Sequence, residues 1–224
     1  MDFKDLLARV KSTGVGTADV VDAIWMLHSH RSHISGLVGP PGNETIIGPA
    51  LTISFMPTRD DVMDRALHGL GPAFYQAVAD HDPSGAVLVM ASNGHPTTSM
   101  GGSTKLSRVE NFGMAGVVSD GSLRDFDEIG AYSFSAYCHG EAIMRGGPEV
   151  LPFLSDVPVA VGGVTVIPGD IIFADPTGVA VVPAAEADKI FEMAIENKAA
   201  ELGMLQMIAA EDPAVVLAEG SGEV

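Results

Sequence analysis

Residues 113–125 run GMAGVVSDGSLRD, and they are the most informative part of the chain about its fold. Gly116 to Ser119 is a short apolar run, typical of a strand buried on both faces. It ends in Asp120-Gly121, a turn signal, so the residues that follow lie at the carboxyl end of a strand. Proteins of alternating strands and helices commonly place their sites at that edge of the sheet. The stretch therefore predicts an α/β fold and indicates where its chemistry lies.

The segments before this stretch show the same alternation of strand and helix. Residues 86–91 are wholly apolar and predict a second buried strand, and the turn Gly101-Gly102 leads into a helix expected over residues 103–112. Another strand is expected over residues 50–55. Further helices are expected over residues 3–10, from Thr17 as the N-cap, over 60–67 and over 72–79.

The second half of the chain predicts a β-rich meander. Its short apolar runs are separated by Gly-Gly, Pro-Gly-Asp and Asp-Pro-Thr-Gly turns. Strands are expected over residues 132–137, 157–161, 164–167, 171–174 and 179–182. A long helix from 184 to about 208 and a frayed tail to 224 complete the chain. No repeat or linker interrupts residues 1–224, so we expect one domain.

Composition limits the partners and the compartment. The 224 residues include 12 Lys and Arg against 29 Asp and Glu, and the net charge of −17 argues against binding the phosphate backbone of nucleic acid. The single cysteine, Cys138, cannot form an internal disulfide, which fits a reducing compartment. Charged residues break up the first eleven positions, and no run approaches the roughly 18 apolar residues of a membrane helix. We expect a cytoplasmic protein that binds neither nucleic acid nor membrane.

Arg124 and Asp125 are the first candidate functional residues. The guanidinium of Arg124 offers a charged fork of donors to a carboxylate or a keto oxygen, and Asp125 can hold a hard divalent cation directly or through water. Alternatively, the two residues pair with neighbours or cap the following helix. We interpret Asp120 and Gly121 as a tight turn.

The step Gly101-Gly102-Ser103-Thr104 is the second candidate. Glycines let the backbone approach a ligand, and the amides that open the next helix attract anions, although simple turn chemistry explains the same residues. Lys105 either adds charge to such a pocket or is an ordinary solvated helix residue. The group His28, His30 and His33 suggests a metal site, but without a carboxylate or thiol at ligand spacing a polar helix end or loop is the better interpretation.

Several phrases occur in a characteristic order. They are Thr17–Ala23, Gly48–Thr52, Gly101-Gly102, Gly113–Asp125, Gly162–Asp170 and Ala174–Pro183. Together they resemble the RraA-like, or 4-hydroxy-4-methyl-2-oxoglutarate aldolase, family over roughly residues 15–185. The ordered set is specific, whereas any one phrase alone is not.

The resemblance implies a swivelling β/β/α domain assembled as a homotrimer or homohexamer, with sites near subunit interfaces. It implies a lyase that uses Mg²⁺ or Mn²⁺, and that releases pyruvate from a 4-hydroxy-2-oxo acid by retro-aldol cleavage or decarboxylates oxaloacetate. Both reactions pass through the pyruvate enolate. Carried over to this chain, Arg124 would stabilise the enolate oxygen and Asp125 would anchor the metal through water. The amides after Gly102, with Ser103, Thr104 and Lys105, would bind the substrate carboxylate.

The chain departs from the catalytic pattern of the family at two places. Ser103 stands where catalytic members usually carry an Asp or Glu, and Ala91-Ser92-Asn93-Gly94 stands where an Asp is usual. Non-catalytic members that bind and inhibit ribonuclease E also lack the first acidic residue. The alternative function is therefore a protein-binding regulator of ribonuclease E activity.

Overall fold

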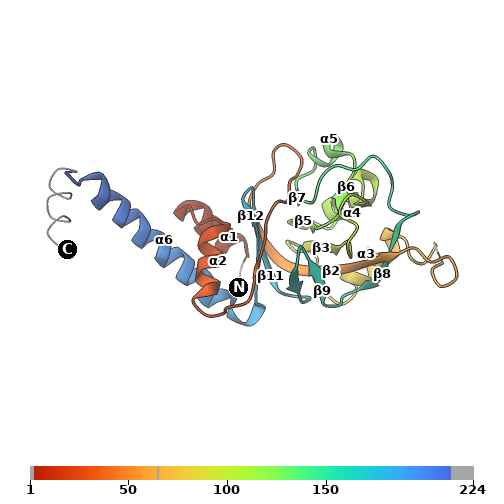
Figure 1. Cartoon of the computed structure of the whole chain (residues 1–224), viewed down its shortest axis with the longest axis horizontal. Helices are drawn as coiled ribbons and strands as arrows, with labels where there is room; N and C mark the ends of the chain where they lie inside the picture. Colours follow the sequence, from red (N-terminus) through yellow and green to blue (C-terminus); the bar gives the residue numbers. More distant parts are fainter. Residues whose placement is uncertain (1–2, 65, 213–224) are drawn as a thin grey trace, which may run out of the picture.

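The computed structural model describes residues 3–64 and 66–212, and a mixed β-sheet forms its centre (Figure 1). The strands follow the order β1-β12-β11-β2-β3-β5-β7, and β8 pairs with β2 beside this path. Their bounds are β1 His33–Ile34, β2 Ile46–Pro57, β3 Val87–Ala91, β5 Gly116–Ser119, β7 Ser135–Tyr137, β8 Val150–Ser155, β11 Ile171–Asp175 and β12 Gly178–Val182.

The long strand β2 connects the antiparallel part of the central sheet to its parallel part. Its first residues pair antiparallel with β11, and the stretch from Ala50 to Ser54 then runs parallel to β3. Strands β3, β5 and β7 continue the parallel part. The strands predicted over residues 50–55, 86–91 and 116–119 are confirmed, and so is the α/β class.

Alternate residues of the central strands feed two separate cores. In β3, Leu88 and Met90 belong to the core beneath the helices, whereas Val87 and Val89 belong to the core beneath a β-hairpin. The helices on the first face are α3 (Leu70–Val78), α4 (Ser103–Asn111) and α5 (Phe126–Ile129), and the hairpin consists of β9 (Val159–Val161) and β10 (Val164–Val166). The layers thus lie in the order hairpin, sheet, helices.

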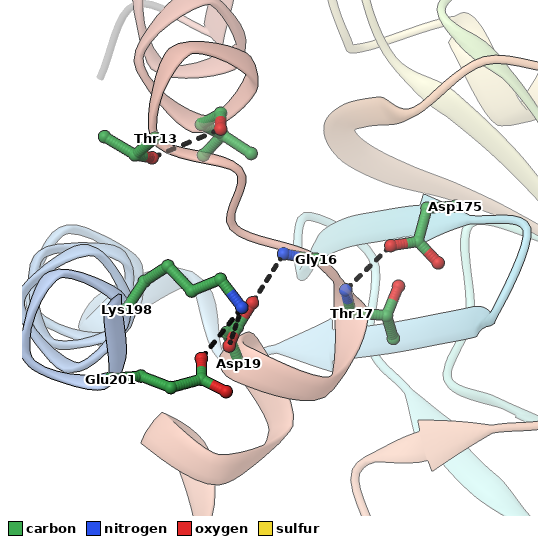
Figure 2. Close-up of polar contacts among 8 residues, drawn as sticks. Thr13, Gly16, Thr17, Asp19, Asp175, Lys198 and Glu201 are labelled. Atoms are coloured by element: carbon green, nitrogen blue, oxygen red, sulfur yellow. Dashed lines mark hydrogen bonds and ion pairs between the residues drawn. The ribbon is translucent and has the colours of Figure 1, made fainter. Parts of the chain in front are cut away.

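The terminal helices cover the antiparallel part of the sheet. They are α1 (Phe3–Thr13), α2 (Thr17–Trp25), the 3₁₀ turn η1 (Ala184–Glu186) and α6 (Ala187–Ala209). Phe173 and Ile171 of β11 pack against them. Lys198 of α6 binds Asp19 of α2 at 3.4 Å and Glu201 at 2.8 Å, so α6 is held to α2 by charge as well as by apolar packing (Figure 2). Within the described residues, no helix has both the length and the apolar character to span a membrane.

The helix predicted over residues 60–67 is wrong. The described residues of that range form isolated turns, closed by bonds such as that from the Met63 amide to the Arg59 carbonyl at 2.9 Å. Val62 and Leu67 are exposed at 55% and 66%, and among the described residues of this range only Met63 is buried, so these residues provide no apolar stripe to hold a helix against the body.

The five strands predicted for the second half are confirmed as β7, β9, β10, β11 and β12, but they do not form one meander. Strands β9 and β10 leave the central sheet and form their own layer, while β11 and β12 join it. Strand β8 was not predicted, because Pro152 interrupts its apolar pattern. It pairs only with the second half of β2. Gly16, not Thr17, is the N-cap of α2. The tail predicted from about 209 lies, from residue 213 on, outside the described residues.

Candidate functional site

Two short strands bring the two sequence candidates together. Strand β4 (Ser99–Gly101) ends just before α4, and β6 (Ser122–Leu123) ends just before Arg124. They pair in parallel, and the Arg124 amide donates to the Gly101 carbonyl at 2.9 Å. Because both strands end at the same edge, the Gly-Gly step and the Arg-Asp pair lie side by side.

Asp125 lies at the N-terminus of α4 and binds it directly. Its Oδ2 atom accepts hydrogen bonds from the Ser103 amide at 3.1 Å and from the Ser103 hydroxyl at 3.2 Å. The same residue stands at the N-cap position of α5 with φ at +66°, in the left-handed region. A carboxylate at this place offsets the positive end of the α4 dipole. One of the amides expected to bind substrate is thus already engaged by Asp125.

Gly102 permits this contact. A Cβ atom at residue 102 would lie 2.6 Å from the Asp125 Oδ2 atom, which is too close for any side chain. The glycine therefore lets the Asp125 carboxylate come this close to the backbone.

These residues line a cleft of about 330 Å³. Leu70, Phe55, Val150 and Leu151 supply apolar walls, and the polar wall comes from the N-terminus of α4 and from the end of β6. The polar and glycine positions lining it are Ser99, Gly101, Gly102, Thr104, Lys105, Arg124, Asp125, Arg145, Gly146 and Gly147. Of the predicted substrate-binding residues, only Ser103 is not on the wall, and it contacts Asp125 instead.

Arg145 was missed by the sequence analysis. It pairs with Ser99 of β4 through an isolated parallel bridge, which carries its segment to the rim of the cleft. The following Gly146 is required there, because a Cβ atom would meet the Ser99 carbonyl oxygen at 2.2 Å. A second Gly-Gly step directly after an arginine is the sequence signal that marks this segment.

The charged residues that line the cleft are mostly positive, whereas the net charge of the chain is negative. Lys105, Arg124 and Arg145 line it together with one carboxylate, Asp125, although the chain carries a net charge of −17. Arg124 contacts Asp125 only loosely, at 3.7 Å from Nη2 to Oδ1, and its side chain is 37% exposed. The guanidinium is therefore held near Asp125 with donors left for a ligand. An anion with one or two carboxylates fits these surroundings.

A metal ion would find few ligands in this chain alone. The described residues contain no group of three or more His, Cys, Asp or Glu side chains placed to hold one. Asp125 is the only carboxylate on the described wall of the cleft, and its Oδ1 atom faces the Arg124 guanidinium. Mg²⁺ commonly keeps several waters and takes one or two carboxylates with substrate oxygens. The donors fit a weakly bound, largely hydrated cation.

Two other candidates contribute to structure. Asp120 accepts from the Ser92 amide at 2.7 Å and from the Gly162 amide at 3.1 Å, so it ties the ends of β3 and β5 to the hairpin turn and does more than close a tight turn. His28 pairs with Glu186 of η1.

The single cysteine takes no part in the cleft. Burial raises the pKa of Cys138 to about 11, which keeps this thiol protonated and unreactive at neutral pH.

Comparison with known proteins decides the family. The RraA-like family, described as Aldolase/RraA, matches residues 17–181. The chain belongs to the RraA-like family. The family resemblance predicted from the ordered phrases is thereby confirmed, and the matched range ends before α6.

Two kinds of relatives accompany this RraA-like chain. A Halalkalibacterium halodurans protein with the provisional name 4-hydroxy-4-methyl-2-oxoglutarate aldolase is 29% identical over 157 residues, 70% of this chain and 69% of that protein. The crystal structure of Streptomyces coelicolor RraAS2, titled an unusual member of the RNase ES inhibitor RraA family, is 29% identical with a TM-score of 0.75, over 89% of this chain and 95% of that one. A Pseudomonas syringae protein of uncharacterised function, 23% identical with a TM-score of 0.77 over 93% and 90% of the two chains, shows the same fold.

Proposed function

We propose that this protein is a lyase acting on a small 2-oxo acid, with pyruvate as the product. The observation that carries the proposal is the cleft itself, which Lys105, Arg124 and Arg145 line together with Asp125 in a chain of net charge −17. The provisional aldolase name of the Halalkalibacterium relative supports the reaction class. Oxaloacetate and 4-hydroxy-2-oxo dicarboxylic acids are dianions, which suits three cations around one carboxylate.

Each residue has a distinct part in this reaction. The amide of Thr104, next in the first turn of α4 after the one that Asp125 engages, binds the substrate's 1-carboxylate, with Lys105 adding charge. Arg124 donates to the 2-oxo oxygen, which becomes the negatively charged enolate oxygen as the bond between C3 and C4 breaks. Arg145, at the rim, binds the distal carboxylate. Protonation of the enolate at C3 then gives pyruvate.

The two reactions differ in what they require of a base. In decarboxylation the C4 carboxylate leaves as carbon dioxide and its bonding electrons form the enolate, so no base is needed. In retro-aldol cleavage the 4-hydroxyl group must lose a proton, and Asp125 is the carboxylate on the described cleft wall that can accept it. Decarboxylation therefore makes the smaller demand on this cleft.

A divalent cation, Mg²⁺ or Mn²⁺, belongs to this proposal. Asp125 would hold it through water, with the Ser103 hydroxyl group nearby. Such a cation supplies charge that stabilises the enolate. Because a single carboxylate holds it, we propose that it binds weakly and is exchanged readily.

The direct test measures pyruvate release. Purified protein is given oxaloacetate or 4-hydroxy-4-methyl-2-oxoglutarate with Mg²⁺, with Mn²⁺ and with EDTA. Metal-dependent release that EDTA abolishes is the expected result. If EDTA does not affect pyruvate release, the metal has no part in the reaction. If neither acid yields pyruvate, the lyase proposal is wrong.

The second candidate is a protein-binding regulator of ribonuclease E. The structural likeness to RraAS2, which is described as an unusual member of the RNase ES inhibitor family, favours it, as does Ser103 in place of an acidic residue. Inhibition of ribonuclease E cleavage by the same preparation, with no pyruvate released, would establish this alternative.

A further inference from the structure

A second cavity lies on the hairpin side of the central sheet, whereas the apolar wall of the cleft belongs to the core on the helix side. Its volume is about 480 Å³. The segment before β1, the hairpin strand β10, the turn after β10 and the end of β12 supply its walls. The two sets of lining residues have no member in common. A cavity of this volume is large enough for a small organic ligand.

Ser32 belongs to the wall of this cavity and carries a polar atom without a partner. The residue is only 1% exposed, and its carbonyl accepts from the Val181 amide at 2.8 Å. Its hydroxyl oxygen, in contrast, has no hydrogen-bond partner among the described residues. A buried polar group left unpaired destabilises a fold by about 1–3 kcal/mol. A ligand that places a polar atom within reach of this hydroxyl group removes that penalty.

Two opposite charges line the cavity without pairing with each other. Arg31 extends toward the hairpin turn, where its Nη1 atom lies 3.4 Å from the position that a Cβ atom of residue 163 would take. Its Nε atom donates to the His33 carbonyl at 3.1 Å, and no ion pair engages the guanidinium within the described part of the chain. Asp170 lies between β10 and β11, where its Oδ2 atom accepts from the Ile167 amide at 2.8 Å. Both charges therefore remain free to bind a ligand.

The surroundings of Asp170 favour a positively charged neighbour. Burial raises the pKa of its carboxyl group, because the charged form is poorly solvated there. An ammonium group beside this carboxylate would offset the loss of solvation. Val164, Ile167, Val181 and Pro183 supply apolar surface to the same cavity. The walls thus offer one cation, one anion and an apolar face.

We propose that this cavity binds a small α-amino acid with an apolar side chain. The Arg31 guanidinium binds its carboxylate, the Asp170 carboxylate binds its ammonium group, and the apolar face contacts its side chain. The Ser32 hydroxyl group donates to the ligand's carboxylate, and His30 lies on the same wall as a further polar group. Asp170 would repel a simple anion and Arg31 would repel a simple cation, whereas a zwitterion satisfies both charges.

Calorimetric titration of the full chain tests the class of ligand. The probes are L-valine, L-leucine and L-phenylalanine, with two analogues of leucine that each lack one charge: 4-methyl-2-oxopentanoate has no ammonium group, and 3-methylbutylamine has no carboxylate. We expect at least one of the amino acids to bind, and each leucine analogue to bind at least about 10-fold more weakly than leucine, because one charged contact is lost. Binding of an analogue as tightly as leucine, or no binding of any of the three amino acids, overturns the proposal.

Variants of the wall test the site itself. Arg31→Gln and Asp170→Asn should each weaken amino-acid binding by about 10-fold, and the asparagine keeps an oxygen that can accept from the Ile167 amide. The matched control Arg108→Gln, on α4 and outside this cavity, should bind as the wild type does. Ser32→Ala should raise the melting temperature of the free protein, because it removes an unpaired buried hydroxyl group, and yet weaken binding. Unchanged affinity in Arg31→Gln and Asp170→Asn, or a Ser32→Ala protein that is less stable and binds equally well, contradicts the assignment.

Discussion

At the scale of single residues, the cleft depends on how closely two backbone segments approach. Gly102 and Gly146 each stand where a Cβ atom would collide, the first with Asp125 and the second with the Ser99 carbonyl. A side chain at residue 102 would push the Asp125 carboxylate away from the first turn of α4, and a side chain at residue 146 would push the Arg145 segment away from Ser99. The chemistry of the cleft therefore relies on residues without side chains as much as on the charged ones.

Arg124 gives the sharpest residue-scale prediction. Under the proposed reaction its guanidinium binds the enolate oxygen more strongly than the ground-state carbonyl. Arg124→Lys should therefore lower kcat/KM for pyruvate release by roughly 10²-fold, an effect of about 2.7 kcal/mol. The control is Arg108→Lys on α4, which contacts Tyr75 and does not line the cleft. Near-normal activity in Arg124→Lys would exclude the assigned role.

Ser103 gives a second prediction. Its hydroxyl lies 3.2 Å from the Asp125 carboxylate, so Ser103→Asp places two carboxylates together at the N-terminus of α4. We expect Mn²⁺ affinity to rise by about 10-fold, because a second anion offsets the dication, and activity at limiting metal to rise with it.

Calorimetric titration with Mn²⁺ measures the change, and Ser103→Asn, which matches Asp in shape without its charge, is the control. Unchanged affinity in Ser103→Asp would show that residue 103 does not face the cation. The helix dipole should limit the loss of stability in this variant.

At the scale of elements, Asp175 joins strand β11 to the start of α2. Its Oδ2 atom accepts from the Thr17 amide at 2.8 Å, and its Oδ1 atom accepts from the Thr177 amide at 2.8 Å and from the Thr177 hydroxyl at 2.6 Å (Figure 2 shows the first). Burial alone would raise the pKa of this carboxyl group, but these hydrogen bonds hold it below its ordinary value. The charged form of Asp175 is therefore stabilised by folding.

This shift predicts the acid stability of the fold. Because the folded pKa is the lower one, the unfolded chain binds more protons, so the contribution of Asp175 is present above its ordinary pKa of 3.8 and is lost as the pH falls through the folded value. Asp175→Asn should lower the free energy of unfolding at pH 7 by about 2 kcal/mol and flatten its fall below about pH 4.

Urea denaturation at several pH values measures this, with the exposed Asp80→Asn as the control. Equal pH profiles for Asp175→Asn and the wild type would show that this carboxylate does not link α2 to the sheet.

At the scale of the whole molecule, we expect a homotrimer or homohexamer, as the family resemblance implies. With a net charge of −17 per chain, repulsion between subunits weakens with salt, so association should strengthen from low to physiological salt concentration. Light scattering at low protein concentration measures it. A strict monomer of 23.2 kDa at physiological salt would contradict the assembly.

Local patterns in the amino-acid sequence were enough to identify some parts of the molecule. Uniformly apolar runs identified β3 and β5, because a strand covered on both faces needs apolar residues at successive positions. The order of the glycine-rich phrases identified the family. The pattern failed over residues 60–67, where a helix would have no buried face, and at β8, whose pairing depends on distant residues of β2.

The family resemblance assigned the Gly102 and Arg124 segments to one site, but the contacts that bring them together, and the third segment beside them, are visible only in the folded chain. Gly102 and Arg124 are far apart in sequence, and the parallel pairing of β4 with β6 makes them neighbours. Arg145 enters through a single bridge to Ser99, and the Asp125 carboxylate binds Ser103 only because both strands end at one edge. Periodicity reports how each segment meets the core, whereas these contacts depend on strand order, which is set by the packing of the whole chain.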